Sequence, residues 1–164
     1  MRFCLLDRIV ELEPGVRVTA VKRLQPDEDY LRDHFPRFPV MSGVLMLEAM
    51  YQAGAWLVRQ TEGFANSLVL LKEARNVKYA DFVTPGKELV VTAEILKSDA
   101  TLTTLKAQGS IDGNIAVHGR LILERFNLAD RFPARANTDP YLRNEYRIVL
   151  QQLLKPTSEA AKPA

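Results

Sequence analysis

The sequence has little cysteine, little histidine and no excess of one charge. It has one cysteine and two histidines in 164 residues, so we expect no disulfide framework, no cysteine zinc finger and no multi-histidine metal site. The 22 basic and 20 acidic residues leave a net charge of +2. Nucleic-acid binding depends on a dense basic face, so this balance argues against a nucleic-acid partner. No apolar run approaches the ~20 residues that a membrane span needs.

The N-terminal segment lacks the pattern of a secretory signal. Its apolar stretch, residues 3–6, is interrupted at once by Asp7 and Arg8, and no small-residue cleavage site follows. We therefore expect a cytoplasmic, reducing setting, in which Cys4 acts as a small buried hydrophobe rather than a nucleophile. The length suits one main domain, and 47% hydrophobic residues are enough for a sizeable core.

One segment combines a stiff loop with a long apolar helix. Residues 34–43, HFPRFPVMSG, hold two prolines three positions apart, which fix the backbone and exclude a helix there. Residues 43–60 follow as a predicted helix, with Ser42 as its N-cap. Between Val44 and Val58 the only strongly polar side chains are Glu48 and Gln52. A helix that is apolar on every face is a buried helix.

The flanking segments predict an antiparallel sheet around that helix. Strands are expected at about 16–20, 75–83, 88–97, 101–111 and 114–125. Residues 3–10 are expected to form a short helix or turn, and 26–32 a short helix. The dipeptide Asp112-Gly113 predicts a two-residue hairpin between the last two strands. One buried helix followed by consecutive strands indicates an α+β domain in which a twisted sheet wraps the helix.

The chain divides into a main domain, 1–126, and a C-terminal extension, 127–164. The extension begins as a polar, irregular stretch and then has apolar residues at helical spacing. We expect an amphipathic helix at about 140–155, with Asp139 and Pro140 as its N-cap and first helical residue. Packing on the domain or on a second copy is the simpler expectation for this helix, and a lid or partner contact is the alternative.

Three residues of the loop and helix are candidates for chemistry. Glu48 and Gln52 lie four residues apart and therefore share one helix face. Removing a carboxylate from water favours its protonated form, which a general acid requires, although the carboxylate can instead meet solvent or an arginine. His34 precedes the proline-stiffened loop, which suits either a positioned base or a histidine bonded to a nearby carbonyl. His118 lies within a predicted strand and is expected to be a surface or packed residue.

Gly43 opens the predicted helix, where backbone N–H groups carry partial positive charge. Such a group is a ready donor to the oxygen of a thioester carbonyl. A glycine also lets a ligand approach the backbone closely. The alternative reading is that glycine simply permits the junction between loop and helix.

The segment HFPRFPVMSGVL, residues 34–45, with Glu48 and Gln52 after it, resembles the signature of the FabZ-type 3-hydroxyacyl-acyl carrier protein dehydratases. The opening LLDRIVELEPG, the turn at 83–86 and the strands up to about residue 125 are also similar to that family, so the resemblance covers about three-quarters of the chain. The glutamate at 48 favours FabZ over the related FabA isomerase-dehydratases.

The resemblance implies a hot-dog fold, with the long helix inside and the antiparallel sheet around it. It also implies a homodimer whose sheets join edge to edge, often assembled as a trimer of dimers. His34 of one subunit would then face Glu48 of the other in a tunnel for an acyl chain carried on phosphopantetheine. No metal or redox cofactor is implied. The partner would be acidic acyl carrier protein, for which Arg75 and Lys78 are candidate contacts.

The implied reaction, in fatty-acid or lipid A biosynthesis, converts a (3R)-hydroxyacyl thioester into a trans-2-enoyl thioester and water. His34 would remove the C2 proton, Gly43 would stabilise the thioester oxygen, and Glu48, oriented by Gln52, would protonate the leaving hydroxyl. Two positions depart from the family. Arg37 stands where glycine is usual and Ser42 where proline is usual. Arg37 is expected either to narrow the tunnel or to bind the pantetheine phosphate.

Two other classes of protein share the implied fold. One is a non-catalytic module that binds acyl carrier protein or an acyl chain, and the other is a hot-dog acyl thioesterase. The presence of both His34 and Glu48 favours a dehydratase over the binding module. Thioesterases of this fold usually place their acid elsewhere and lack the HFPxxP loop.

Overall fold

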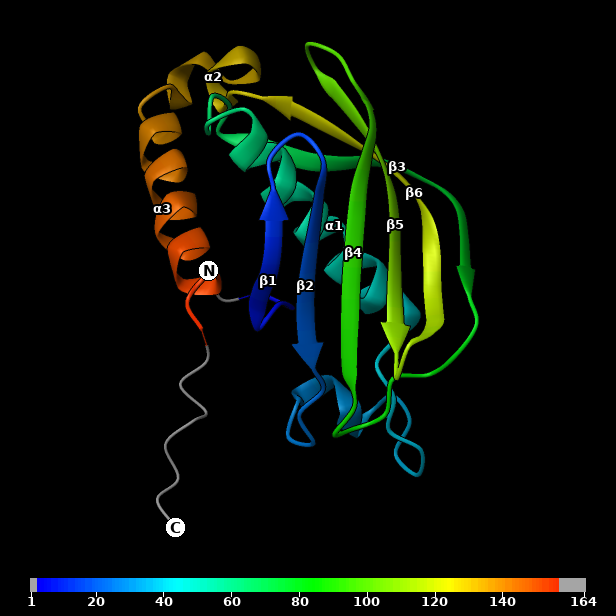
Figure 1. Ribbon diagram of the computed structural model, residues 1–164. Coiled ribbons are helices and arrows are strands. Elements are labelled where there is room, and N and C mark those ends of the chain that lie inside the picture. Colours follow the sequence, from blue (N-terminus) through cyan, green and yellow to red (C-terminus); the bar gives the residue numbers. More distant parts are fainter. Residues whose placement is uncertain (1–2, 157–164) are drawn as a thin grey trace.

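A six-stranded antiparallel sheet curves around one long helix, α1 (Figure 1). The computed structural model describes residues 3–156. The spatial strand order is β1-β2-β4-β5-β6-β3, which leaves β1 and β3 at the two edges. The strands are β1 Arg8–Glu13, β2 Arg17–Arg23, β3 Leu68–Tyr79, β4 Glu88–Ser98, β5 Leu102–Ile111 and β6 Asn114–Phe126. The predicted α+β architecture is confirmed.

Helix α1, Gly43–Thr61, packs its middle and C-terminal turns into the concave face of the sheet. Met50, Trp56 and Leu57 are buried, and burial of each such side chain stabilises the fold by about 1.5–3 kcal/mol. The first turn differs, because Val44 is 66% exposed. The prediction that this helix is buried on every face is therefore wrong for its N-terminal turn in a single chain.

The helix lies very close to the sheet at Gly54. A Cβ atom placed there would clash with Leu105 Cδ1, and Leu105 belongs to the buried part of β5. The absence of a side chain at Gly54 is thus what allows α1 to approach the central strands.

The β5–β6 hairpin forms as predicted. Asp112 and Gly113 both have positive φ, 51° and 83°, which a two-residue type I′ turn requires. A residue pair of this kind matches the natural twist of the two strands, and the hairpin closes with Ile111 opposite Asn114. The register then shifts between Gly109 and Ser110.

Two predicted segments differ in the structure. The segment expected as a short helix or turn instead supplies β1, whose backbone pairs with β2. Its apolar residues Leu5 and Leu6 lie in the core just before the strand begins. The strand expected at 75–83 is one continuous strand from Leu68 to Tyr79, because nine of its residues pair with β6. In both segments, hydrogen bonding to the neighbouring strand, rather than the local alternation of apolar and polar residues, determines where the strand lies.

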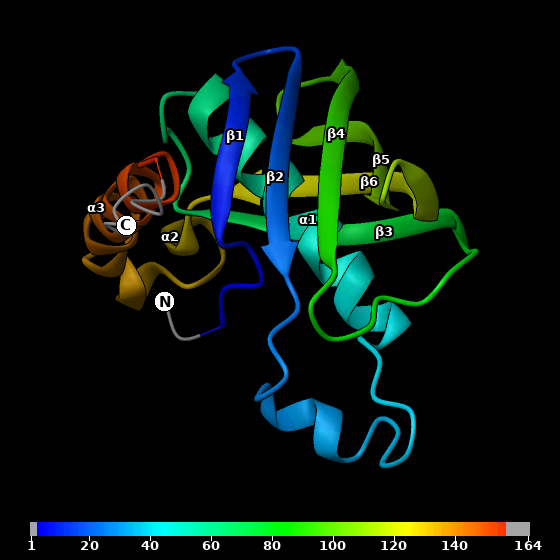
Figure 2. The same ribbon diagram turned by 60° about the horizontal axis from the view of Figure 1, so that its bottom comes forward.

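A long connection leads from β2 to α1. It holds a short 3₁₀ helix, η1 Asp29–Arg32, followed by the proline-containing loop, and it projects beyond the sheet in Figure 2. The loop folds back on itself, because the amides of Phe35 and Phe38 each donate to the other's carbonyl, at 3.1 and 3.0 Å. The two prolines and this pair of bonds make a compact, fixed approach to α1.

The C-terminal extension lies beside the β1 edge of the sheet (Figure 1). It contains α2 Leu128–Arg131, the 3₁₀ helix η2 Pro133–Arg135 and α3 Thr138–Leu153. Leu150 and Leu153 of α3 join the main core, so this helix packs on its own domain. Asn137, not Asp139, occupies the N-cap position. Asp139 instead accepts hydrogen bonds from the amides of Leu128 and Ala129, which open α2.

Candidate active site

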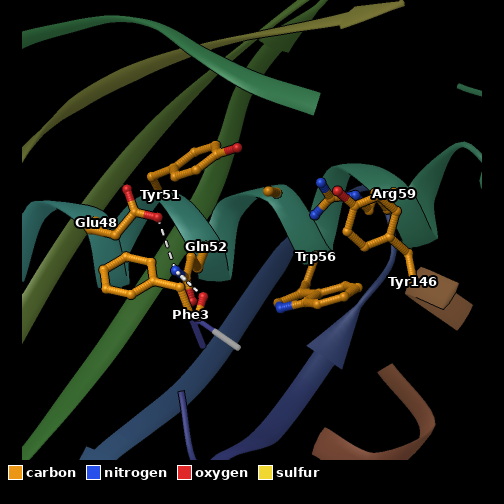
Figure 3. A pocket seen from close by; sticks show the side chains of 8 residues that line it. Phe3, Glu48, Tyr51, Gln52, Trp56, Arg59 and Tyr146 are labelled. Carbon is orange, nitrogen blue, oxygen red and sulfur yellow. Dashed lines mark hydrogen bonds between the residues drawn. The ribbon is translucent and has the colours of Figure 1, made fainter. Parts of the chain in front are cut away.

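An apolar cavity of about 230 Å³ runs along the face of α1 that the sheet does not cover (Figure 3). It extends from Glu48 at one end to Arg59 at the other. Helix α1 supplies most of the wall, the N-terminal segment supplies Phe3, and α3 supplies Tyr146. The full lining is Phe3, Glu48, Tyr51, Gln52, Ala55, Trp56, Arg59 and Tyr146.

Gln52 fixes the orientation of Glu48. Its Nε2 donates to Glu48 Oε1 at 2.9 Å, and its own Oε1 accepts from the Leu5 amide at 2.9 Å. Gln52 is buried and Glu48 is half-buried. Within residues 3–156 the second carboxylate oxygen of Glu48 has no hydrogen-bond partner, so it is available to a ligand in the cavity. The predicted contact between Glu48 and Gln52 is present.

His34 lies half-buried in the loop that precedes α1. Its Nδ1 is 3.1 Å from the Val40 carbonyl oxygen, and its own carbonyl accepts from the Val40 amide at 2.9 Å. A carbonyl can only accept, so Nδ1 carries the proton in this hydrogen bond. Neutral His34 then presents Nε2 as an unprotonated acceptor, which is the form a base requires. The bond to a local carbonyl is therefore compatible with a catalytic role.

Gly43 and Ser42 form the start of α1. Ser42 occupies the N-cap position, but its side chain makes no capping bond. Its carbonyl accepts the first helical hydrogen bonds, from Leu45 and Met46. The Gly43 amide donates to no backbone acceptor in the described part of the chain. A Cβ atom on Gly43 would lie 2.9 Å from the Tyr79 ring, so glycine also allows the end of β3 to approach the helix.

One chain does not bring His34 to Glu48. Every residue that lines the Glu48 cavity comes from the N-terminal segment, α1 or α3, and none from the loop at 34–42. Across residues 3–156 no hydrogen bond or other polar contact joins the two side chains.

The three basic candidates lie outside this cavity. Arg37 is exposed at the tip of the proline loop. Arg75 and Lys78 are exposed on the edge strand β3, where Arg75 is paired with Glu73 at 2.6 Å. This pairing raises the pKa of Arg75 through the hydrogen bond from its guanidinium to Glu73. Lys78 lies opposite His118 of β6, which is exposed as predicted for a surface strand residue.

Arg59 is the cavity residue that the sequence patterns did not indicate. Arg59 follows Glu48 by eleven positions and Gln52 by seven, so the three share one helix face, and this spacing could have indicated it. It falls just beyond the apolar run. Its guanidinium stacks over Tyr146 at 4.0 Å and faces Trp56 at 5.0 Å. Burial lowers the pKa of Arg59, while the nearby Tyr146, Tyr51 and Glu62 oppose that effect. Burial also raises the pKa of Tyr51, against the opposing charge of Arg59.

Cys4 is half-buried, and its thiol donates to the Leu6 carbonyl at 3.3 Å. Among residues 3–156 no group of three or more His, Cys, Asp or Glu side chains is placed to hold a metal ion. No helix in the same range combines the length and apolar character needed to cross a membrane.

Comparison with known proteins connects this architecture to a class. The fold is the hot-dog fold, which the chain shares with a dehydratase heterocomplex, ApeI:P, from Xenorhabdus doucetiae (TM-score 0.64, 21% identity, 80% of this chain and 88% of that one). A mutant thioesterase from Pseudomonas aeruginosa has the same fold (TM-score 0.59, 16% identity, 74% of this chain and 81% of that one). At these identities the likeness concerns the fold alone.

Sequence comparison is more specific. A FabA-like domain matches residues 1–120. The 3-hydroxyacyl-acyl carrier protein dehydratase FabZ of Ruminiclostridium cellulolyticum is 38% identical over 119 residues, which are 73% of this chain and 84% of the relative. FabZ of a Janthinobacterium species is 35% identical over 133 residues, 79% of this chain and 85% of the relative. The chain belongs to the family of FabZ-type 3-hydroxyacyl-acyl carrier protein dehydratases.

Proposed function

We propose that this chain, as a hydro-lyase of fatty-acid biosynthesis, dehydrates (3R)-hydroxyacyl thioesters with His34 of one copy and Glu48 of another. The products are a trans-2-enoyl thioester and water. The main support is the Glu48 carboxylate, which Gln52 holds at the wall of an apolar cavity with one oxygen still unpaired among the described residues. An acid in such a place can reach a hydroxyl on an acyl chain.

The reaction needs proton transfers only. His34 Nε2 takes the proton from C2, the C2–H electron pair forms the C2=C3 bond, and the C3–O bond breaks. Glu48 gives its proton to the departing oxygen, and solvent returns the proton of His34 to Glu48. The Gly43 N–H, at the positive end of α1, would stabilise charge on the thioester oxygen. This scheme uses no cofactor beyond the phosphopantetheine that carries the substrate.

A homodimer would supply the second copy. Among residues 3–156 the outer edge of β3 has no strand partner, which makes it a ready site for strand pairing. Large apolar side chains near it are exposed, including Val44, Tyr79 and the edge-to-face pair Phe38 and Phe82, whose ring centroids are 5.7 Å apart. Exposed apolar groups gathered in one region favour a protein contact. A trimer of such dimers is the larger assembly we propose for this family member.

We further propose acyl carrier protein as the partner, with Arg37, Arg75 and Lys78 as contacts for its acidic surface or for the pantetheine phosphate. Arg75 already has Glu73 as a partner, so Lys78 and Arg37 are the better candidates. The single cysteine, with no disulfide to form, fits a reaction in the cytoplasm.

Mixing two inactive variants tests the shared site. His34→Ala and Glu48→Gln should each lower kcat by about 10²–10⁴-fold with a 3-hydroxyacyl thioester, measured by enoyl absorbance. When the two variants are unfolded, mixed and refolded together, about a quarter of wild-type activity should return, because half of the dimers are mixed and each mixed dimer has one intact site.

The control is His118→Ala, which changes an exposed histidine and should keep wild-type activity. No recovery on mixing would refute the shared site. A Glu48→Gln variant with the full rate would refute the acid. Release of free thiol in place of enoyl product would show a thioesterase instead.

A further inference from the structure

Arg59 is a buried cation without an anionic partner in the described chain. Arg59 is 6% exposed, and its Nε atom has no hydrogen-bond partner among the described residues. No carboxylate lies within ion-pair distance of it in residues 3–156. A buried charge is costly unless something pairs with it.

The neighbouring groups do not supply that pair. Glu62, the nearest acid in sequence, is engaged by Arg125 at 3.3 Å. The Tyr51 hydroxyl donates its proton to the Val69 carbonyl at 2.7 Å. Arg59 also has a hydrogen bond to the Tyr51 side chain, which carries no negative charge. Tyr146 and Trp56 offer ring faces, which offset part of the cost of burial but leave the Nε–H donor unpaired among the described residues.

The position of Arg59 links it to Glu48. Both line the same cavity, at its two ends, and the side chains of Tyr51 and Trp56 form part of the wall between them (Figure 3). Arg59 follows Glu48 by eleven positions of the helix, which is about 16 Å along the axis. A ligand that fills the space would need an apolar stem and, at the Arg59 end, a group that accepts hydrogen bonds.

We propose that Arg59 binds a carboxylate at the distal end of the acyl chain, so that the preferred substrates are 3-hydroxyacyl thioesters with a terminal carboxyl group. This inference rests on the proposed function, because it assumes that the acyl chain extends from Glu48 into the cavity. The planar guanidinium can bind both oxygens of a carboxylate at once.

The C-terminal extension takes part in this arrangement. Tyr146 of α3 covers the outer side of the guanidinium, and it lies beyond the 1–120 segment that matches the FabA-like domain. The aromatic cover limits the positions that Arg59 can adopt and keeps water from it. The preference is thus built from residues of this chain's own extension as well as from α1.

Binding can be measured without catalysis, because Trp56 is the sole tryptophan and lines the cavity. The probes are the monomethyl and dimethyl esters of one medium-chain dicarboxylic acid, which differ only in one free carboxylate. The monomethyl ester should change Trp56 fluorescence with an affinity about tenfold or more above that of the dimethyl ester. Arg59→Met should abolish the difference, and Arg59→Lys should keep part of it.

Arg147→Met is the matched control. It removes the same charge from α3, but Arg147 is exposed, lies over Phe64 and does not line the cavity. It should bind both esters as the wild type does. Equal binding of the two esters by the wild-type protein would overturn the proposal, and this comparison uses the wild-type protein alone.

Turnover gives the second readout. With two 3-hydroxyacyl thioesters of equal length, one ending in a methyl and one in a carboxylate, the wild type should favour the carboxylate in kcat/KM by about tenfold. Arg59→Met should reverse this preference. If neither thioester is dehydrated but the esters are still distinguished, the proposed function fails and the carboxylate site stands. If both are dehydrated equally, the site fails and the function stands.

Discussion

Gln52 connects the Glu48 carboxylate to the N-terminal segment. Its amide nitrogen donates to Glu48 Oε1 at 2.9 Å and to the Phe3 carbonyl at 3.3 Å, while its oxygen accepts from the Leu5 amide at 2.9 Å. Both polar atoms of the Gln52 side chain therefore make hydrogen bonds. The orientation of the Glu48 carboxylate thus depends on Phe3 and Leu5, which precede β1 and lie far from Glu48 in sequence.

Replacing Gln52 by methionine should therefore disturb catalysis more than binding. The side chain keeps its length but loses three hydrogen bonds, so Glu48 is free to turn away from the substrate. We expect kcat to fall by about 10–100-fold with a much smaller change in KM. Gln60→Met, on the exposed last turn of the same helix, should leave both constants unchanged. If Gln52→Met changed KM and left kcat at the wild-type value, a positioning role for Gln52 would be refuted.

Gly43→Ala should lower activity through Tyr79. The new Cβ would lie 2.9 Å from the Tyr79 ring, so either the ring or the first turn of α1 must move. Because Tyr79 is 49% exposed, the ring can give way, and we expect a loss of stability below about 1.5 kcal/mol. Activity should fall by about tenfold or more if the Gly43 N–H binds the thioester oxygen.

A double variant separates the two effects of Gly43→Ala. Tyr79→Ala removes the whole ring, including the Cδ1 and Cε1 atoms at 3.1 and 2.9 Å, so Gly43→Ala in that background meets none of them. Thermal unfolding should then show no further loss from the alanine. If activity also returns to the level of Tyr79→Ala alone, displacement of the helix start caused the loss. Persistent loss of activity would point to crowding of the ligand by the methyl group itself.

Local patterns predicted the parts of this fold in which neighbours in sequence are also neighbours in space. The Asp112-Gly113 turn and the helix after the proline loop are examples, since each is decided by a few adjacent residues. The strand β1 was not predicted, because its pairing with β2 rather than its own pattern holds it extended. The contact of Glu48 with Gln52 was predictable from a spacing of four.

The far end of the cavity could not be predicted in the same way. Tyr146 reaches Arg59 from a helix almost ninety residues later, and no local pattern reports that contact. The proposed pairing of His34 with Glu48 also depends on a second copy of the chain, which no pattern within one sequence describes. Motif spacing indicates which residues act together, but only the packing of separate elements, or of separate chains, shows where they meet.

Asp139 ties the C-terminal extension to the main domain. Its carboxylate accepts from the Leu128 amide at 2.7 Å, the Ala129 amide at 3.1 Å and the Ser67 hydroxyl. Burial by itself raises the pKa of Asp139, but these three hydrogen bonds and the charge of Arg143 together lower it below its ordinary value. The folded protein therefore prefers the charged form more strongly than the unfolded chain does.

The lowered pKa of Asp139 determines how its contribution to stability depends on pH. The contribution of Asp139 to stability is fully present above the ordinary aspartate pKa of about 4 and is lost as the pH falls through the lower pKa of the folded state. At neutral pH, Asp139→Asn should reduce the free energy of unfolding by about 1–3 kcal/mol, because buried donors lose a charged acceptor. The difference between wild type and variant should shrink as the pH falls below about 4.

Urea unfolding at a series of pH values measures this difference, with Asp29→Asn as the matched control. The Asp29 side chain is 96% exposed, and its one ion pair within the described range 3–156 is with Arg32, at 3.8 Å. Its replacement should therefore leave the unfolding curves unchanged. If Asp139→Asn destabilised the protein equally at pH 7 and pH 3, charge would not be the source of its contribution. If Asp139→Asn destabilised α3 but not the sheet, the unfolding curve would show two transitions. The extension and the sheet would then unfold as two separate units.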